Sequence, residues 1–81
     1  MIIEGKVRNV TLVLAADVCL RRMAKSPYRC TRNLIELGMS AFPEKLSDQE
    51  QYDLSHELLT ACKNKDAVQA KALFVSSFLE K

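Results

Sequence analysis

The sequence has little of what enzymes, metal sites and membrane proteins require. It contains no tryptophan, one histidine, two glycines and two prolines in 81 residues. Two glycines cannot make a glycine-rich phosphate loop, and neither G-x-S-x-G nor H-E-x-x-H occurs. The longest apolar run, Val10 to Ala16, is interrupted by Thr11 and is far shorter than a bilayer requires. We therefore expect no catalysis, no cofactor and no membrane span, and we interpret the chain as cytoplasmic.

The three cysteines argue against two common ways of stabilising a small domain. Cys19, Cys30 and Cys62 are an odd number, lie far apart in sequence and form no C-x-x-C pair. A disulfide framework favours an even set, and a zinc site favours clustered Cys and His ligands, whereas His56 stands alone. The sequence predicts reduced, mostly buried thiols and no metal site. Because so short a chain buries only about 60–65% of its unfolded surface, self-association is the remaining source of stability.

Charge is divided unevenly along the chain. Residues 1–42 carry seven lysines and arginines against three acids, whereas residues 43–81 carry five lysines against seven acids. The net charge of +2 therefore combines a basic half with an acidic half. A basic half favours an anionic partner, although an imbalance of this size also falls within ordinary surface variation.

The C-terminal half has the signals of a helical hairpin. Ser47 to Glu50 matches the S-x-x-E capping box, and Asp66 can cap a second helix after a short joint. The last helix, from Ala67 to about Leu79, has an apolar stripe that Leu73, Phe74 and Phe78 broaden: Val68, Ala72, Val75 and Leu79. Its apolar residues cover more than half the circumference. Either the rest of the chain encloses this helix, or a second copy packs against it.

The middle and the start of the chain are harder to interpret. Pro27 ends what precedes it, and a helix is predicted from Cys30 to about Met39, where Gly38 either ends the helix or marks a close packing contact. The first 25 residues allow two structures. Helical spacing joins Val7, Val10, Leu14 and Val18, whereas the β-branched run from Val10 to Leu14 suits a short strand.

If the strand is taken, residues 10–42 resemble the ribbon-helix-helix family of small bacterial and phage repressors, the Arc and Mnt type. Leu14-Ala15-Ala16-Asp17-Val18 resembles the family's L-P-x-[DE]-[LV] junction, with alanine in place of proline. The segment from Arg29 to Ile35 resembles its R-S-x-[ST]-x-x-[LI] start of the second helix. The resemblance implies two chains whose strands pair into a ribbon that enters the major groove of DNA.

The resemblance also implies roles for individual residues. Three outward strand residues would contact bases: Asn9, Thr11 and Val13. Four residues would contact phosphates: Arg8, Arg29, Thr31 and Arg32. The inward strand residues and two phenylalanines would form the oligomer interface: Val10, Leu12, Leu14, Phe74 and Phe78.

The sequence thus predicts a mostly α-helical fold with a short N-terminal strand, two helices and a C-terminal helical hairpin. Residues 1–43 form the DNA-binding module, and residues 44–81 form a hairpin for oligomerisation or for binding another protein. The predicted function is a DNA-binding transcriptional repressor that acts as a homodimer or tetramer. The alternative is an all-helical bundle of four or five helices that serves as an adaptor, inhibitor or chaperone of other proteins and binds no nucleic acid.

Overall fold

The computed structural model describes residues 2–23 and 25–79, with side chains from residue 9 onward. These residues form helices joined by short turns, and they include no strand. The helices are α1 (Ile2–Leu20), α2 (Pro27–Ala41), α3 (Asp48–Lys63) and α4 (Ala67–Phe74), and α4 continues into a π-helix, η1 (Val75–Leu79).

The predicted strand is wrong, because Val10–Leu14 lies within α1. Leu12, Ala16 and Leu20 recur every four residues and are buried, as one face of a helix requires. A strand would place Val10, Leu12 and Leu14 on one face, whereas the helix turns Leu12 inward and leaves the other two exposed. The preference of β-branched residues for strands is small, and burial of the inward face outweighs it. The structure therefore agrees with the all-helical alternative.

Helix α2 begins earlier than the sequence predicts. The Ser26 hydroxyl accepts the backbone N–H of Arg29 at 3.3 Å, and Pro27 occupies the first turn, where its missing N–H costs nothing. The helix runs through Gly38 to Ala41. A Cβ at Gly38 would collide with the ring of Phe78, so this glycine marks a close packing contact and does not end the helix.

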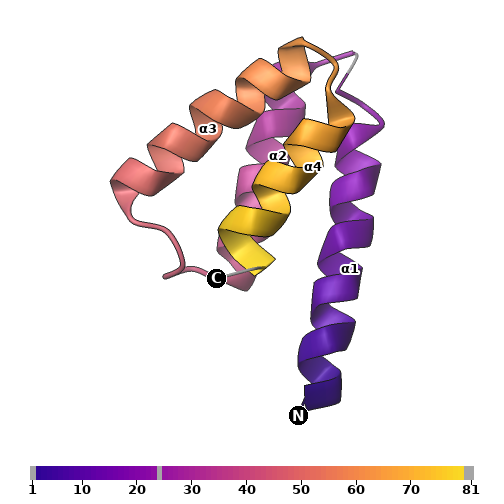
Figure 1. The fold of residues 1–81 in the computed structure, drawn as a ribbon, viewed down its shortest axis with the longest axis vertical. Helices are drawn as coiled ribbons and strands as arrows, with labels where there is room; N and C mark the ends of the chain where they lie inside the picture. Colours follow the sequence, from indigo (N-terminus) through magenta and orange to yellow (C-terminus); the bar gives the residue numbers. More distant parts are fainter. Residues whose placement is uncertain (1, 24, 80–81) are drawn as a thin grey trace.

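The hairpin of α3 and α4 is confirmed. The Ser47 hydroxyl accepts the Glu50 N–H at 3.2 Å, and the Glu50 carboxylate accepts the Ser47 N–H at 3.1 Å, which completes the capping box. Asn64 caps the end of α3, and the Asp66 carboxylate accepts the Gln69 N–H at 3.0 Å to start α4. Figure 1 shows the two helices running in opposite directions from this turn.

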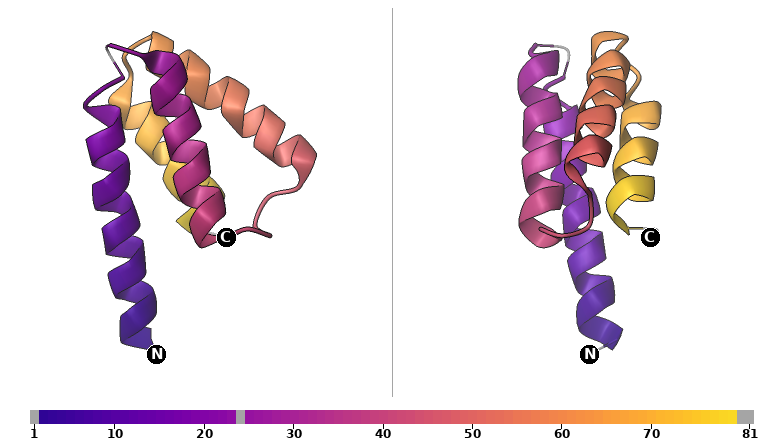
Figure 2. Two further views of the ribbon diagram at one scale, coloured as in Figure 1. Left: turned by 180° about the vertical axis from the view of Figure 1, so that it is seen from behind. Right: turned by 90° about the vertical axis from the view of Figure 1, so that its left-hand side faces the viewer.

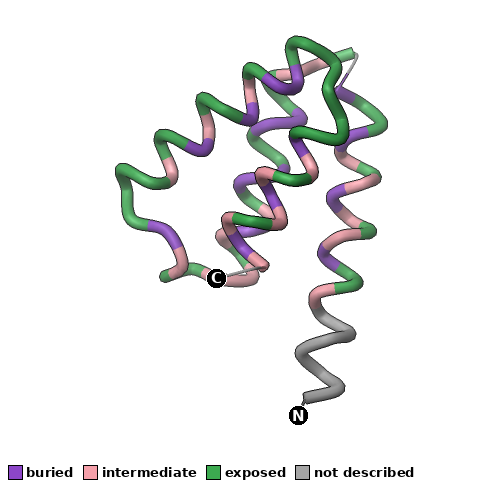
Figure 3. The backbone as a smooth tube through the Cα atoms, viewed as in Figure 1, coloured by how far each residue is buried: buried purple, intermediate pink, exposed green. Residues whose placement is uncertain are grey.

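One hydrophobic core joins all the helices (Figure 3). Helix α4 contributes Ala70 and Phe74 and η1 contributes Phe78, and the two phenylalanine rings lie 5.3 Å apart between centroids. These phenylalanines are at most 1% exposed, so the prediction that they form an oligomer interface is wrong. The whole core is made by Leu12, Ala16, Leu20, Met23, Cys30, Leu34, Ile35, Leu46, Leu54, Leu58, Ala61, Cys62, Ala70, Phe74 and Phe78.

The described chain measures 38 × 26 × 17 Å along its principal axes. Much of the long dimension comes from α1, whose first turns extend beyond the ends of α2 and α4 (Figures 1 and 2). The turns after α1 and after α3 lie together at the opposite end of the molecule (Figure 1). Within the described chain, no helix combines the length and the apolar character needed to cross a bilayer.

Candidate interaction surfaces

Helix α1 carries a second apolar stripe on the side that faces away from the core. Val10, Leu14 and Val18 are spaced four residues apart and are 58%, 60% and 49% exposed. They occupy the side of α1 opposite Leu12 and Ala16. We call Val10, Leu14 and Val18 the outer stripe. A helix that is apolar on opposite sides is normally covered on both, and here one side has no cover from the described chain.

Helix α4 lies beside α1 and adds to the same exposed surface. The ammonium of Lys71 lies 3.2 Å from the carboxylate of Asp17, which ties the two helices together. Next to this ion pair, Val68 is 82% exposed and Ala72 is also exposed. A hollow of about 350 Å³ lies between the helices, and its lining residues are Asp17, Leu20, Arg21, Ala67, Val68 and Lys71.

The exposed side of α4 is the one that the sequence predicted to be its apolar face. That stripe is correct as a spacing but wrong as a buried face, because Val68 and Ala72 point to solvent and Val75 is only half-buried. The face that enters the core holds Ala70 and Phe74. Sequence spacing found two apolar stripes on this helix and chose the outer one.

The residues predicted to contact bases do not share a face. Asn9, Thr11 and Val13 are two residues apart, so on a helix they lie about 200° apart around the axis. Thr11 is exposed, whereas Asn9 and Val13 are half-buried. The structure therefore does not bring these three side chains to a common reading surface.

The residues predicted to contact phosphates have mixed positions. Arg29 and Arg32 are exposed near the start of α2, and the Arg32 guanidinium lies 3.7 Å from the Glu36 carboxylate. Thr31 is 7% exposed, and its hydroxyl donates a hydrogen bond to the Pro27 carbonyl at 2.8 Å. Its inclusion in a phosphate clamp is wrong, because the hydroxyl is used inside the helix. The side chain of Arg8 lies outside the described residues.

Positive charge gathers where the turns meet. Lys63, at the end of α3, places its ammonium 5.0 Å from the centroid of the Tyr28 ring at the start of α2. Asp66 is the acid in this region and is engaged as the cap of α4. We call the exposed cations here the basic end: Arg21, Arg22, Lys25, Arg29, Lys63 and Lys65.

The start of α3 and the loop before it carry the opposite charge. Exposed acids gather there and form what we call the acidic end: Glu44, Asp48, Glu50 and Asp53. Figure 1 shows this region at the far end of α3 from the turn that leads into α4. The uneven charge of the sequence thus becomes a separation of charge across the molecule.

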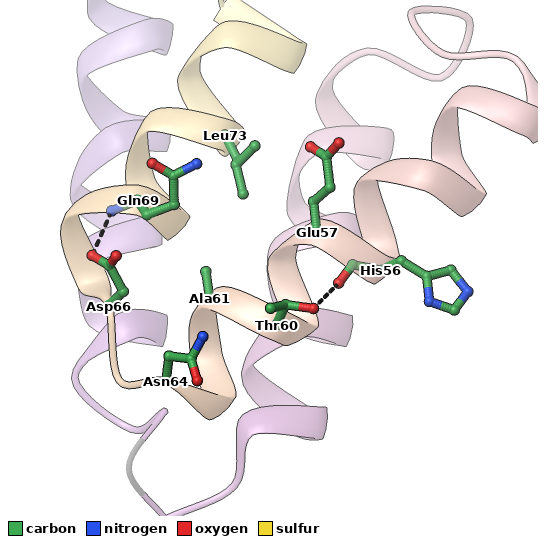
Figure 4. Close-up of a pocket in the computed structure, with 8 residues that line it drawn as sticks. All are labelled: His56, Glu57, Thr60, Ala61, Asn64, Asp66, Gln69 and Leu73. Atoms are coloured by element: carbon green, nitrogen blue, oxygen red, sulfur yellow. Dashed lines mark hydrogen bonds between the residues drawn. The ribbon is translucent and has the colours of Figure 1, made fainter.

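A polar hollow of about 470 Å³ lies between α3 and α4 (Figure 4). Its side chains do not form an acid–base pair: the imidazole of His56 points away from the hollow, and the Asp66 carboxylate accepts the N–H of Gln69. The His56 ring instead packs edge-on against Tyr52, with centroids 4.5 Å apart. The carboxylate of Glu57 has no imidazole partner at this site (Figure 4).

The three cysteines, distant in sequence, come together where α1, α2 and α3 meet. The Cys30 thiol donates a hydrogen bond to the Cys19 carbonyl at 3.2 Å. Burial, followed by the neighbouring thiols of Cys62 and Cys19, raises the pKa of Cys30 to about 12. Burial also raises the pKa of Cys19, against the opposing charge of Arg22. Such thiols are poor nucleophiles, and the described residues contain no group of His, Cys, Asp or Glu that could hold a metal ion.

Comparison with known proteins gives this chain no relatives: no family model, curated protein or solved structure matches it.

Proposed function

We propose that this chain is a helical protein-interaction module and that α1 is its binding element. The observation that carries the proposal is the outer stripe, in which Val10, Leu14 and Val18 remain about half exposed or more. The core uses only the opposite side of α1. The proposal is the adaptor, inhibitor or chaperone alternative in its general form.

The spacing of the outer stripe suits a helical partner. Side chains at i, i+4 and i+8 form a ridge about 12 Å long, which is how one amphipathic helix presents anchors to another. Fully burying a side chain such as Leu14 contributes about 1.5–3 kcal/mol, so completing its burial from 60% exposed contributes on the order of 1 kcal/mol. The three residues together therefore offer a few kcal/mol to a partner that covers them.

The ribbon mechanism of DNA recognition is not part of this proposal. It requires an extended segment at Val10–Leu14 that pairs with a second chain, and that segment is helical. Its base-contacting residues would also need to share a face, which Asn9 and Thr11 do not.

The basic end supports a second candidate function, the binding of a nucleic-acid backbone without a ribbon. Its specific support is the cluster of exposed cations around Arg22 and Arg29, with Asp66 engaged as a helix cap. Binding through phosphate contacts should weaken steeply with salt. Fluorescence anisotropy with a labelled duplex at two salt concentrations tests it: no binding to the duplex at low salt removes this candidate.

Site-specific photo-crosslinking in the cells that make the protein tests the main proposal. Leu14→p-benzoylphenylalanine places the reactive group on the outer stripe, and we expect a discrete cross-linked polypeptide. Tyr52→p-benzoylphenylalanine is the matched control, because Tyr52 is 61% exposed on α3, away from the stripe. The proposal fails if position 14 gives no cross-linked species, or only the species that position 52 also gives.

A further inference from the structure

We propose that the outer stripe of α1 is covered by the outer stripe of a second copy of this chain, packed antiparallel about a two-fold axis. This inference rests on the proposed function and names its partner. The interface consists of Val10, Leu14 and Val18 of each α1, extended by Val68 and Ala72 of each α4.

The stripe is suited to pairing with itself. In a two-fold dimer each surface meets an identical one, so Val10 of one copy faces Leu14 of the other, and the reverse contact forms as well. Ridges repeating every four residues pack into the grooves of a like helix at an axis separation of about 8–10 Å. Helix α1 is accessible for this contact because its first turns extend past α2 and α4 (Figure 2).

The charges select the antiparallel orientation. A parallel pair would place the two basic ends side by side, with Arg21 and Arg22 of each copy close to the same cations of the other. Such a like-charge arrangement is unfavourable. An antiparallel pair directs the basic end of each copy toward the acidic end of its partner, where Asp48 and Asp53 are exposed. Charge complementarity therefore favours a second copy of this chain in this one orientation.

The area that a dimer requires explains why α4 takes part. A standard interface buries about 800 Å² on each partner, roughly one seventh of the 5574 Å² of accessible surface on the described chain. Three side chains on a ridge about 12 Å long do not supply that area. Val68, at 82% exposed, and Ala72 widen the surface on the side of α1 where Lys71 pairs with Asp17. The dimer thus needs both helices.

Sedimentation equilibrium of the purified full chain, from about 1 µM to about 1 mM, tests the proposal. We expect a concentration-dependent dimer. Leu14→Glu and Val68→Glu should each raise the dissociation constant by about a hundredfold, because each buries an unpaired carboxylate in the interface. Tyr52→Glu, on α3, is the matched control and should leave the dissociation constant unchanged. Circular dichroism should show native helicity in all three variants, since the replaced side chains are exposed.

Orientation is tested by mixing single Val10→Cys and Leu14→Cys variants with oxidised glutathione. The antiparallel dimer predicts disulfides chiefly between the two different variants, whereas a parallel dimer predicts disulfides between identical ones. A wild-type chain that stays monomeric at the highest concentration overturns the proposal, as does a Leu14→Glu variant that dimerises like wild type. If position 14 then cross-links to a different protein in cells, the interaction module stands and only the second copy is excluded; if it cross-links to nothing, both fail.

Discussion

Helix α1 and the hairpin of α3 and α4 are both helical, but only the hairpin has its ends marked in the sequence. Ser47 and Glu50 begin α3, and Asp66 begins α4, each through a side chain that satisfies a backbone N–H. Helix α1 has no basic residue in its last turn, and a β-branched run lies at its centre. Local signals therefore specify the hairpin, whereas α1 is helical because packing selects one of two structures that its sequence allows.

The comparison also separates what each region leaves exposed. The outer faces of α3 carry acids and other polar residues, which need no cover. The outer face of α1 carries Val10 and Leu14, and the adjoining side of α4 carries Val68. The region whose secondary structure was hardest to predict is thus also the region that leaves an apolar surface for a partner.

The largest expected effect comes from a pair of substitutions that distinguishes helix from strand in α1. Leu12→Asp buries an unpaired carboxylate in the core and should lower the free energy of unfolding by about 3 kcal/mol or more. Leu14→Asp, on the exposed side, should change it by about 0.5 kcal/mol or less in the monomer. Urea unfolding at low protein concentration measures both. Equal losses would mean that residues 12 and 14 share a face, as in a strand.

The capping residues made the hairpin predictable, because caps act over three or four residues and need no tertiary information. The choice between strand and helix at Val10–Leu14 depends on contacts with α2 and α4, which sequence spacing does not reveal. The same limit explains α4. The stripe through Val68 and the stripe through Phe74 both have helical spacing, and the fit of Phe78 against Gly38 decides which one turns inward.

The candidate site was predictable only in part. The spacing of Val10, Leu14 and Val18 was visible as one helical option, but its exposure depends on which residues of α1 the core takes. The basic end joins Arg22, which follows α1, with Lys63 of α3, and only the fold brings them together. The cysteine cluster was missed for the same reason.

A second prediction concerns the contact that locks the hairpin onto α2. Gly38→Ala places a methyl group against the ring of Phe78, which is 1% exposed and has no free space to move into. Overpacking of this kind costs about 1–3 kcal/mol, more than the gain in helix propensity from glycine to alanine. Thermal and urea unfolding should both show the loss. The packing assignment is wrong if the alanine variant is as stable as wild type or more so.

A third prediction uses pH to probe the junction of α1 with α2 and α3. The ordinary thiol pKa is 9.0, and that of Cys30 is about 12, so above pH 9 the unfolded state releases a proton that the folded state keeps. This contribution to stability is complete below pH 9 and declines as pH rises toward 12, by up to about 1.4 kcal/mol per pH unit.

Cys30→Ala serves as the control for this pH effect. Its stability should fall less steeply than that of wild type over the same alkaline range, because the titrating thiol is gone. Lysine and tyrosine ionisation affect both proteins alike, so the difference between the two slopes isolates Cys30. Parallel curves from urea unfolding at each pH would show that the thiol is not held protonated by the fold.

The smallest expected effect is a gain, and it lies at the turn between α3 and α4. Lys65 has a φ of 58°, and its N–H and that of Asp66 bond back to the carbonyls of Cys62 and Ala61, as in a Schellman motif. A left-handed conformation costs a residue with a Cβ about 1 kcal/mol, a cost that glycine avoids. Lys65→Gly also removes one cation from the basic end. Greater freedom of glycine in the unfolded chain offsets part of the gain, so we expect stabilisation of about 0.5 kcal/mol in urea unfolding. Lys65→Ala separates the two effects: it removes the same charge but keeps the strain, so it should leave stability near that of wild type. If alanine stabilises as much as glycine, the gain comes from reduced repulsion at the basic end and not from the backbone.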